Sequence, residues 1–181
     1  MDLLAYLLAG LLVVRGYLYW LVPLTLLAAF NQETSGFIPL LPLALLGLAG
    51  RATSDRRRVL VTVGLASLVF VTVFILLRTV IFPGPREVIG PYGIPPGLQL
   101  LDYNLHLPTT GENLLLTFNV LPLLAIVSLR SGPVLLRRWF WLVVPVWFVI
   151  HLLGSVISET RLLLVPLALV VVPLALSGVA D

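Results

Sequence analysis

The chain has 181 residues, of which 60% are hydrophobic and 10% charged, and it contains no cysteine. With a mean hydropathy of +1.11, this composition excludes an ordinary soluble domain and indicates a protein of the lipid bilayer. The net charge of +3 comes from arginine without any lysine, and no basic patch on a soluble face points to nucleic acid as a partner. The lack of cysteine excludes disulfides, thiolate metal sites and cysteine nucleophiles.

Apolar runs follow one another along the whole chain. The run 59–82 contains a single charged residue, Arg78, and is long enough to cross a hydrocarbon core, which needs about 20 apolar residues. Because the runs lack the alternating polarity of barrel strands, they predict helices. The expected fold is an all-α, polytopic integral membrane helical bundle that forms a single membrane domain over residues 1–181. Its apolar segments are about 3–14, 17–30, 37–50, 59–82, 114–129, 139–157 and 162–178.

Several of these segments are short. The first three have roughly 12 to 14 residues, and helices of this length span a bilayer poorly alone. They are therefore expected to be half-helices, or the first two fuse through Arg15-Gly16 into one tilted helix. Prolines inside most segments predict kinks. The sequence thus predicts five to seven membrane segments with short and kinked helices.

The arginines predict the orientation of the chain. They crowd the short loops 51–58 and 130–138, which the positive-inside rule places in the cytoplasm. The segment 83–113 then becomes an extracytoplasmic loop, and its prolines and glycines leave room only for a short interfacial helix over 98–107. We expect an integral protein of a prokaryotic cytoplasmic membrane.

Polar side chains within the membrane segments gather near the predicted outer face. His151, Ser155 and Glu159 recur at every fourth residue, so on a helix they would line one face over about 12 Å. The structural alternative is a His151 that is hydrogen-bonded inside the bundle. Arg78 is either a ligand or a side chain that snorkels to the membrane interface. Asn119 is either a ligand or a residue that makes an interhelical hydrogen bond.

Together these residues predict a binding site for an anionic group. Two carboxylates, two guanidinium groups, an amide and an imidazole suit a phosphate or lipid headgroup, because arginine binds phosphate oxygens through two parallel hydrogen bonds. No metal-binding spacing is present, no cofactor is expected, and no catalytic residue is assigned. The residues of this predicted outer-face site are Glu33, Arg78, Asn119, His151, Glu159 and Arg161.

Two stretches resemble parts of the C-type glycosyltransferase superfamily. In residues 17–43 a helix ends in Asn-Gln-Glu-Thr and a proline-bearing apolar run follows; in residues 139–175, His151 precedes Glu-Thr-Arg and a leucine and proline run. These polytopic enzymes use polyprenyl-phosphate-linked sugars on the non-cytoplasmic side. The resemblance covers about half the chain, and it implies that Arg161 contacts a lipid phosphate and that the chain corresponds to the later helices of a longer protein.

The chain departs from that superfamily at its catalytic feature. Those enzymes carry the catalytic acid in a long outer loop after an early helix, and no such loop occurs here. Three functions therefore stay open. The chain is a glycosyltransferase-like protein that binds a polyprenyl-phosphate carrier, a non-catalytic subunit of a larger respiratory, photosynthetic or transport complex in the membrane, or a small transporter. For transport, the lack of an internal repeat is unfavourable.

Overall fold

The computed structural model describes residues 2–30, 33–46, 48, 53–81, 93–157 and 160–177. Every regular element among these residues is helical, which confirms the all-α prediction for this part of the chain. Residue contacts divide the chain into two compact units, residues 1–84 (unit 1) and 85–181 (unit 2). Whether the two units form one membrane domain depends on how they pack together, so the single domain expected from the sequence stays a prediction.

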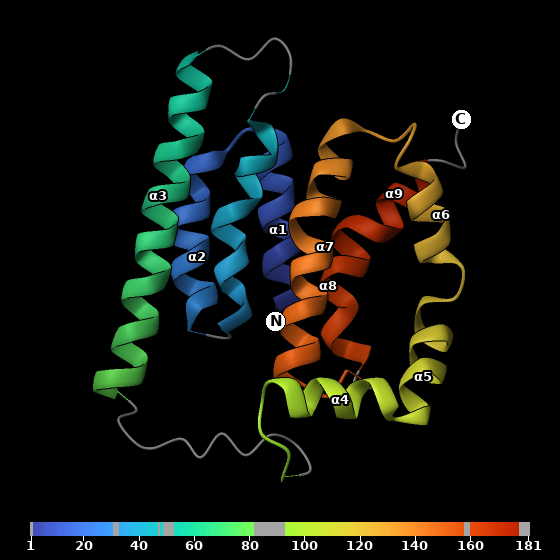
Figure 1. Ribbon diagram of the computed structural model, residues 1–181. Helices are drawn as coiled ribbons and strands as arrows, with labels where there is room; N and C mark the ends of the chain where they lie inside the picture. The colour runs from blue at the N-terminus through green and yellow to red at the C-terminus, as the bar shows by residue number, and fades with distance from the viewer. Residues whose placement is uncertain are drawn as a thin grey trace. The chain divides into compact units, whose positions relative to one another are not determined.

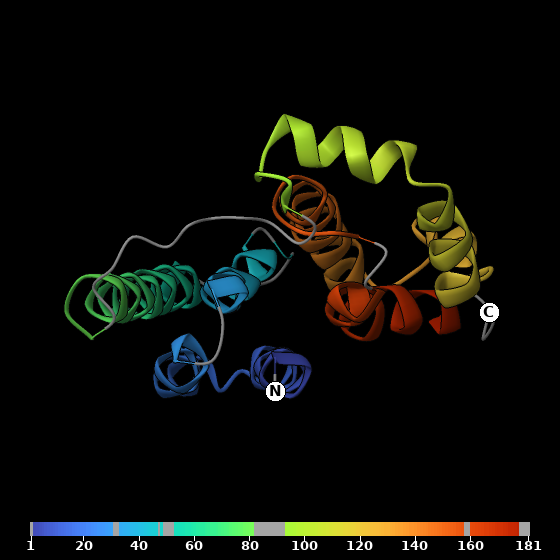
Figure 2. The same ribbon diagram turned by 90° about the horizontal axis from the view of Figure 1, so that it is seen from below.

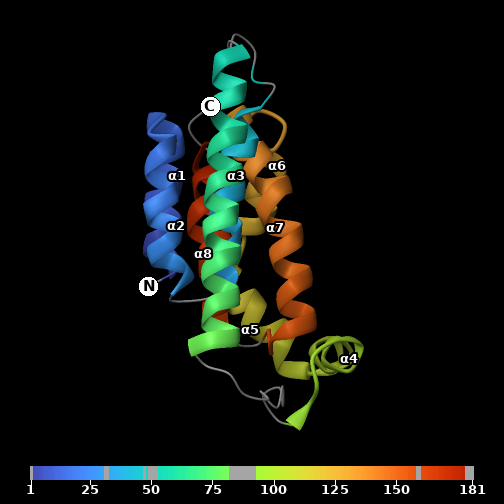
Figure 3. The same ribbon diagram turned by 90° about the vertical axis from the view of Figure 1, so that its left-hand side faces the viewer.

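Unit 1 contains helices that run back and forth beside one another (Figures 1 and 3). After α1 the chain turns at Gly16, whose φ of +75° is a conformation that glycine adopts without strain. The next helix packs back against α1, so the alternative of one fused, tilted helix is wrong. The elements are α1 (Asp2–Arg15), η1 (Leu18–Trp20), α2 (Leu21–Ala29), η2 (Glu33–Leu45), α3 (Thr53–Leu76) and η3 (Leu77–Ile81).

The helix η2 is a tight 3-10 helix through all of its residues. Pro39 and Pro42 lie inside it, and each removes one backbone N–H that a regular α-helix would use. η2 packs closely on α3, and a Cβ added to Gly36 would lie 2.8 Å from a ring carbon of Phe70. Glycine at this position therefore permits the close approach of the two helices.

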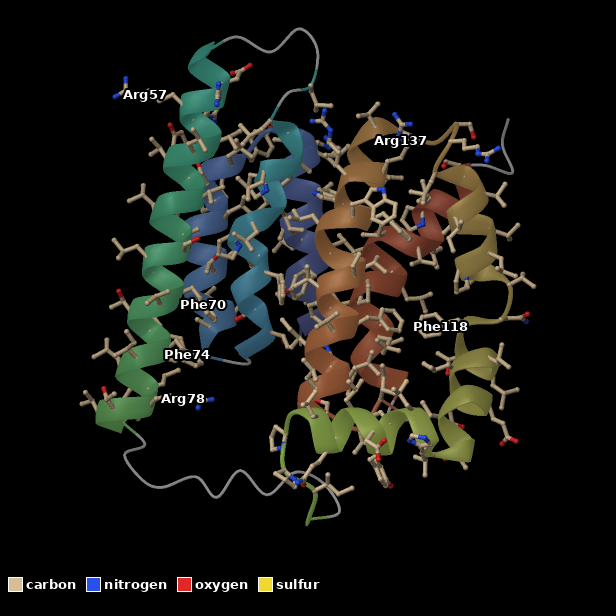
Figure 4. All side chains as sticks on the ribbon, viewed as in Figure 1. Arg57, Phe70, Phe74, Arg78, Phe118 and Arg137 are labelled. Carbon is tan, nitrogen blue, oxygen red and sulfur yellow. The ribbon has the colours of Figure 1, made fainter. Side chains whose placement is uncertain are left out.

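Three arginines of unit 1, Arg15, Arg57 and Arg58, lie at one end of the unit. The guanidinium carbon of Arg58, near the start of α3, lies 4.9 Å from the ring centre of Tyr19, which follows the turn after α1. In Figure 4, Arg57 lies at this end of α3 and Arg78 at the other. Arg15 ends α1 beside the same turn. The side of the membrane to which this end belongs stays a prediction.

Unit 2 contains a helix that lies crosswise at the end of the others. The predicted segment 114–129 is divided between two helices. The first helix ends at Phe118, and the second is bent by 62° relative to it. The described part of the predicted loop 83–113 is largely helical. The elements are α4 (Leu98–His106), α5 (Pro108–Phe118), α6 (Leu121–Ser128), α7 (Val134–Gly154), η5 (Thr160–Leu163), α8 (Leu164–Pro166), η6 (Leu167–Val171) and α9 (Val172–Ser177).

The core of unit 2 lies where α6, α7 and α9 meet. Ala125, Leu174 and Ala175 are buried there, and Phe140 of α7 packs against them. The small alanines let the helices approach closely, and the chain enters α7 through a tight bend at Gly132. A Cβ added to Gly132 would lie 2.7 Å from the Ser128 carbonyl oxygen and from a methyl group of Leu174. Only glycine fits this bend without displacing its neighbours.

Two helices in the described part are long and apolar enough to cross a membrane. They are the 27 residues Asp55–Ile81 and the 21 residues Val134–Gly154, and the bent pair α5 and α6 makes a third if it is a single span. The other apolar helices have 10–17 residues. The chain thus has the helices of an integral membrane protein, while the prediction of five to seven spanning segments is not confirmed.

Candidate functional site

The C-terminal end of α7 is capped by residues from other elements. The last carbonyl groups of a helix have no partner within the helix itself. In α7 the backbone N–H of Gly97 donates to the Leu153 carbonyl oxygen at 2.7 Å. The carboxamide nitrogen of Asn104 donates to the carbonyl oxygen of Leu152 at 2.9 Å. Both donors come from α4 or the residue before it, and α4 crosses the end of α7 in Figures 1, 2 and 3.

Asn104 also fixes the chain where it leaves α7. Its side-chain nitrogen donates a second hydrogen bond to the Ser155 carbonyl oxygen at 2.8 Å, and its oxygen accepts from the Ile157 N–H at 3.0 Å. Both N–H donors of the carboxamide and one acceptor position are thereby used. The residue is only 1% exposed. One buried side chain therefore sets the path of the backbone that leads toward η5.

Two aromatic rings continue this network along α7. His151 is 3% exposed and its Nδ1 lies 2.8 Å from the Trp147 carbonyl oxygen, so Nδ1 carries the proton, because a carbonyl can only accept. The two rings stack with their centres 4.9 Å apart. Trp147 donates from Nε1 to the Leu162 carbonyl oxygen at 2.8 Å. Trp147 thus ties α7 to η5 at the residue after Arg161.

The helix α5 also packs against η5, and its N-terminal end follows directly on α4. No side chain caps this end, where Leu107 is the capping residue and Pro108 the first residue of the helix. The first N–H groups of a helix carry a partial positive charge and attract anions. Within the described residues, the hydroxyl of Thr110 in this first turn is buried without a hydrogen-bond partner. Of the N–H groups at this end, those of Leu107 and Thr110 donate to the carbonyl oxygens of Tyr103 and Leu107 at 2.9 and 3.0 Å, and Pro108 has none. The positive character of this end therefore comes mainly from the helix dipole.

Unit 2 contains the predicted site residues His151 and Arg161. His151 and the backbone of Arg161 are linked through Trp147, as described above. Nothing is described of the Arg161 side chain, and Glu159 lies outside the described residues. His151 has the hydrogen-bonded, buried place that its structural alternative predicts. It orders the helix end and does not present an open ligand position.

Asn119 lies away from the N-terminal end of α5. It is exposed and sits at the break between α5 and α6, with a φ of +48°. Because α5 starts at Pro108, earlier than predicted, Asn119 is eleven residues and about 16 Å of helix from the α5 start. It shapes a turn, and the described structure does not bring it to His151.

In unit 1 the predicted residues are Glu33 and Arg78. Glu33 begins η2, and nothing is described of its side chain. Arg78 is exposed near the end of the spanning helix, with its guanidinium carbon 4.7 Å from the ring centre of Phe74. The rings of Phe74 and Phe70 stack in turn, with centres 5.8 Å apart. A cation on an aromatic ring at the end of a span suits the predicted interfacial position of Arg78.

The ionisable residues of α4 belong to its outer surface. His106 Nδ1 lies 3.0 Å from Asp102 Oδ1, and the two side chains are 77% and 75% exposed. Such an exposed pair contributes little to stability. Across the described residues, no three histidine, aspartate or glutamate side chains are placed to hold a metal ion.

Sequence reasoning missed Asn104, Trp147 and Gly97, which organise the end of α7. The signal for Asn104 is its position on an otherwise apolar stripe, between Leu100 four residues before and Leu107 three residues after. A polar residue on the buried stripe of a short helix predicts a hydrogen-bonding role inside the fold. Trp147 gives no comparable signal, because tryptophan is common in membrane helices.

Comparison of the chain with protein-family models, with curated proteins and with solved structures finds no match in any of the three.

Proposed function

We propose that unit 2 binds the phosphate group of a membrane lipid in the corner between η5 and the N-terminal end of α5. The observation that carries the proposal is the pair of contacts that hold η5 there. Trp147 fixes the Leu162 carbonyl at 2.8 Å, and α5 packs against η5. These contacts support the proposal that Arg161, the residue before Leu162, takes part in a site between η5 and α5.

The chemistry of the corner suits a phosphate ester. A guanidinium group binds two phosphate oxygens with two parallel, charge-assisted hydrogen bonds. The partial positive charge at the N-terminal end of α5 adds a second source of positive potential. Arg161 is thus the principal ligand, while Trp147, His151 and Asn104 position its segment. The resemblance to C-type glycosyltransferases specifies the lipid as a polyprenyl phosphate.

The proposal includes a topology of five to seven membrane segments with the corner at the outer face. It is supported by the separation of charges within unit 2. Arg137 lies at the start of α7 in Figure 4, whereas η5 follows the end of this 21-residue helix, about 30 Å away along its axis. If the loops 51–58 and 130–138 are cytoplasmic, as the positive-inside rule predicts, the corner faces the other side.

Titration of the purified chain with a polyprenyl phosphate tests the proposal. Arg161→Ala should weaken binding by about 10- to 100-fold, since a hydrogen bond to a charged group contributes about 1.5–3 kcal/mol. The affinity of Arg161→Lys should lie between those of Arg161→Ala and the unaltered chain, because lysine keeps the positive charge but lacks the planar guanidinium group. The control is Arg130→Ala, an exposed arginine at the other end of α7. Equal Kd values for Arg161→Ala and the unaltered chain would refute the proposed site.

A second candidate function is that of a non-catalytic subunit in a membrane complex. The break between α5 and α6 favours it, because Asn119 and Val120 are exposed there and no side chain caps the start of α6. Lipid does not satisfy irregular backbone, which therefore needs protein or a water-filled cavity beside it. Cross-linking from Asn119→Cys in the native membrane should then capture one protein at a fixed ratio. Capture of lipid alone would contradict this candidate.

A further inference from the structure

The helix α4 has an unusual distribution of exposed side chains. Two large apolar residues are among the most exposed on it, Leu98 at 80% and Leu105 at 67%. Two ionisable residues, Asp102 and His106, are exposed to a similar degree. A surface helix in water normally exposes its polar face alone. The exposed surface of α4 is therefore more apolar than a helix fully surrounded by water would normally have.

We propose that α4 lies in the interface between membrane and water, with Leu98 and Leu105 among the lipid acyl chains and Asp102 with His106 among the headgroups. This assignment does not depend on the proposed phosphate site. It concerns a different surface, the outward side of α4, and it names the lipid bilayer as the partner of that surface.

Helix geometry separates α4 into three faces. Each residue advances about 100° around the axis, so residues seven apart nearly coincide and residues four apart are neighbours. Leu98 and Leu105 thus form one apolar edge. Asp102 and His106 form a polar edge beside it, joined by their contact of 3.0 Å. Leu100 and Asn104 form the buried face that packs on unit 2.

The direction of α4 agrees with an interfacial helix. α7 has the length and apolar composition of a membrane span, so its axis runs through the bilayer. α4 lies across the end of α7 in all three ribbon views (Figures 1, 2 and 3). A helix that lies crosswise at the end of a span runs along the membrane plane, at the depth where the span leaves the hydrocarbon.

Hydrogen bonds fix the depth of α4. Gly97 and Asn104 hold the last carbonyl groups of α7 at 2.7 Å and 2.9 Å. α4 therefore cannot move along the membrane normal without uncapping the span. The apolar edge then turns toward the acyl chains, and the neighbouring polar edge turns toward the headgroups. A protein partner or water around α4 would not require apolar side chains on one edge and ionisable side chains on the other.

Because the chain contains no cysteine, a single introduced cysteine can be labelled without first removing others. Leu98→Cys, Leu105→Cys, Asp102→Cys and His106→Cys are each labelled with a nitroxide in phosphatidylcholine bilayers. Collision rates with oxygen, which enriches in lipid, and with a water-soluble nickel complex then report the depth of each label. All four side chains are exposed, so one site of each edge suffices if a variant fails to fold. Val146→Cys, exposed on α7, gives the hydrocarbon reference.

The proposal predicts a split between the two edges. Labels at 98 and 105 should favour oxygen, approaching the reference at 146, and labels at 102 and 106 should favour the nickel complex. Strong nickel collisions at all four positions would place α4 in water and overturn the proposal. Protection of all four positions from both reagents would overturn it in favour of a protein partner that covers α4.

Discussion

The carboxamide of Asn104 donates to the carbonyl oxygen of Leu152 at 2.9 Å, across 48 residues of sequence. Through this bond and its neighbours, a short crosswise helix closes the end of a helix of membrane-spanning length. The same side chain holds the backbone that leads to η5. The order of the proposed phosphate corner therefore depends on a residue that itself need not touch the ligand.

Asn104→Ala should destabilise unit 2. One buried and two half-buried backbone groups lose their partner, and an unsatisfied buried group costs about 1–3 kcal/mol. We expect the thermal unfolding midpoint in detergent to fall by several degrees, together with weaker phosphate binding. Gln99→Ala removes an exposed amide from the same helix and should change neither. Equal midpoints for the two variants would show that the carboxamide does not hold the helix end.

Asn104→Asp separates hydrogen bonding from side-chain volume. The carboxylate is nearly the same size and still accepts from the Ile157 N–H, but it places an oxygen against the carbonyl oxygens of Leu152 and Ser155. This variant should therefore be at least as unstable as Asn104→Ala when the carboxylate is charged. An Asn104→Asp variant with the stability of the unaltered chain would contradict the assigned donor and acceptor roles.

Gly132→Ala and Gly64→Ala should have different effects although the substitution is the same. The added methyl group at 132 would lie 2.7 Å from a backbone oxygen, whereas at 64 it meets no atom within 4 Å. Overpacking of this kind costs about 1–3 kcal/mol, and alanine within a helix is favoured over glycine by about 1 kcal/mol. Denaturation in mixed detergent should show loss of stability for Gly132→Ala only. A loss of the same size for Gly64→Ala would be the opposing result.

Asn119→Gly should stabilise the bend between α5 and α6, and Asn119→Val should weaken it. The φ of +48° at Asn119 is open to glycine without strain, whereas a β-branched residue is strongly disfavoured there. Strained backbone costs about 1–3 kcal/mol per residue. Unfolding midpoints of the three proteins should follow the order Gly, Asn, Val. An order led by Val would mean that the break closes into a continuous helix.

Much of the helical content follows from the sequence, but the breaks do not. The run 59–82 predicts a span that the structure contains, because a long apolar stretch has few other stable forms in a bilayer. The run 114–129 is equally apolar, yet it breaks after Phe118. Composition does not indicate this break, because Asn119 and Pro122 are each tolerated within membrane helices. The choice depends on packing between helices.

The candidate site was partly predictable for a similar reason. His151 and Arg161 flank a turn between helices, which is already visible in the sequence, and Trp147 connects the two sides of this turn. The helix of nine residues over Leu98–His106 was expected from the sequence, but the role of Asn104 within it was not. The residues that accept its hydrogen bonds are 48 and 51 positions away in the sequence. A local sequence pattern does not predict contacts between residues so far apart.

The most direct test of the central claim is native mass spectrometry of the chain, extracted mildly from its own membrane. One spectrum reads both the lipids and the proteins that remain bound. The account predicts a polyprenyl-phosphate mass on the single chain, lost in Arg161→Ala and kept in Arg130→Ala. A stoichiometric protein partner without any such lipid would contradict it and would identify the chain as a subunit.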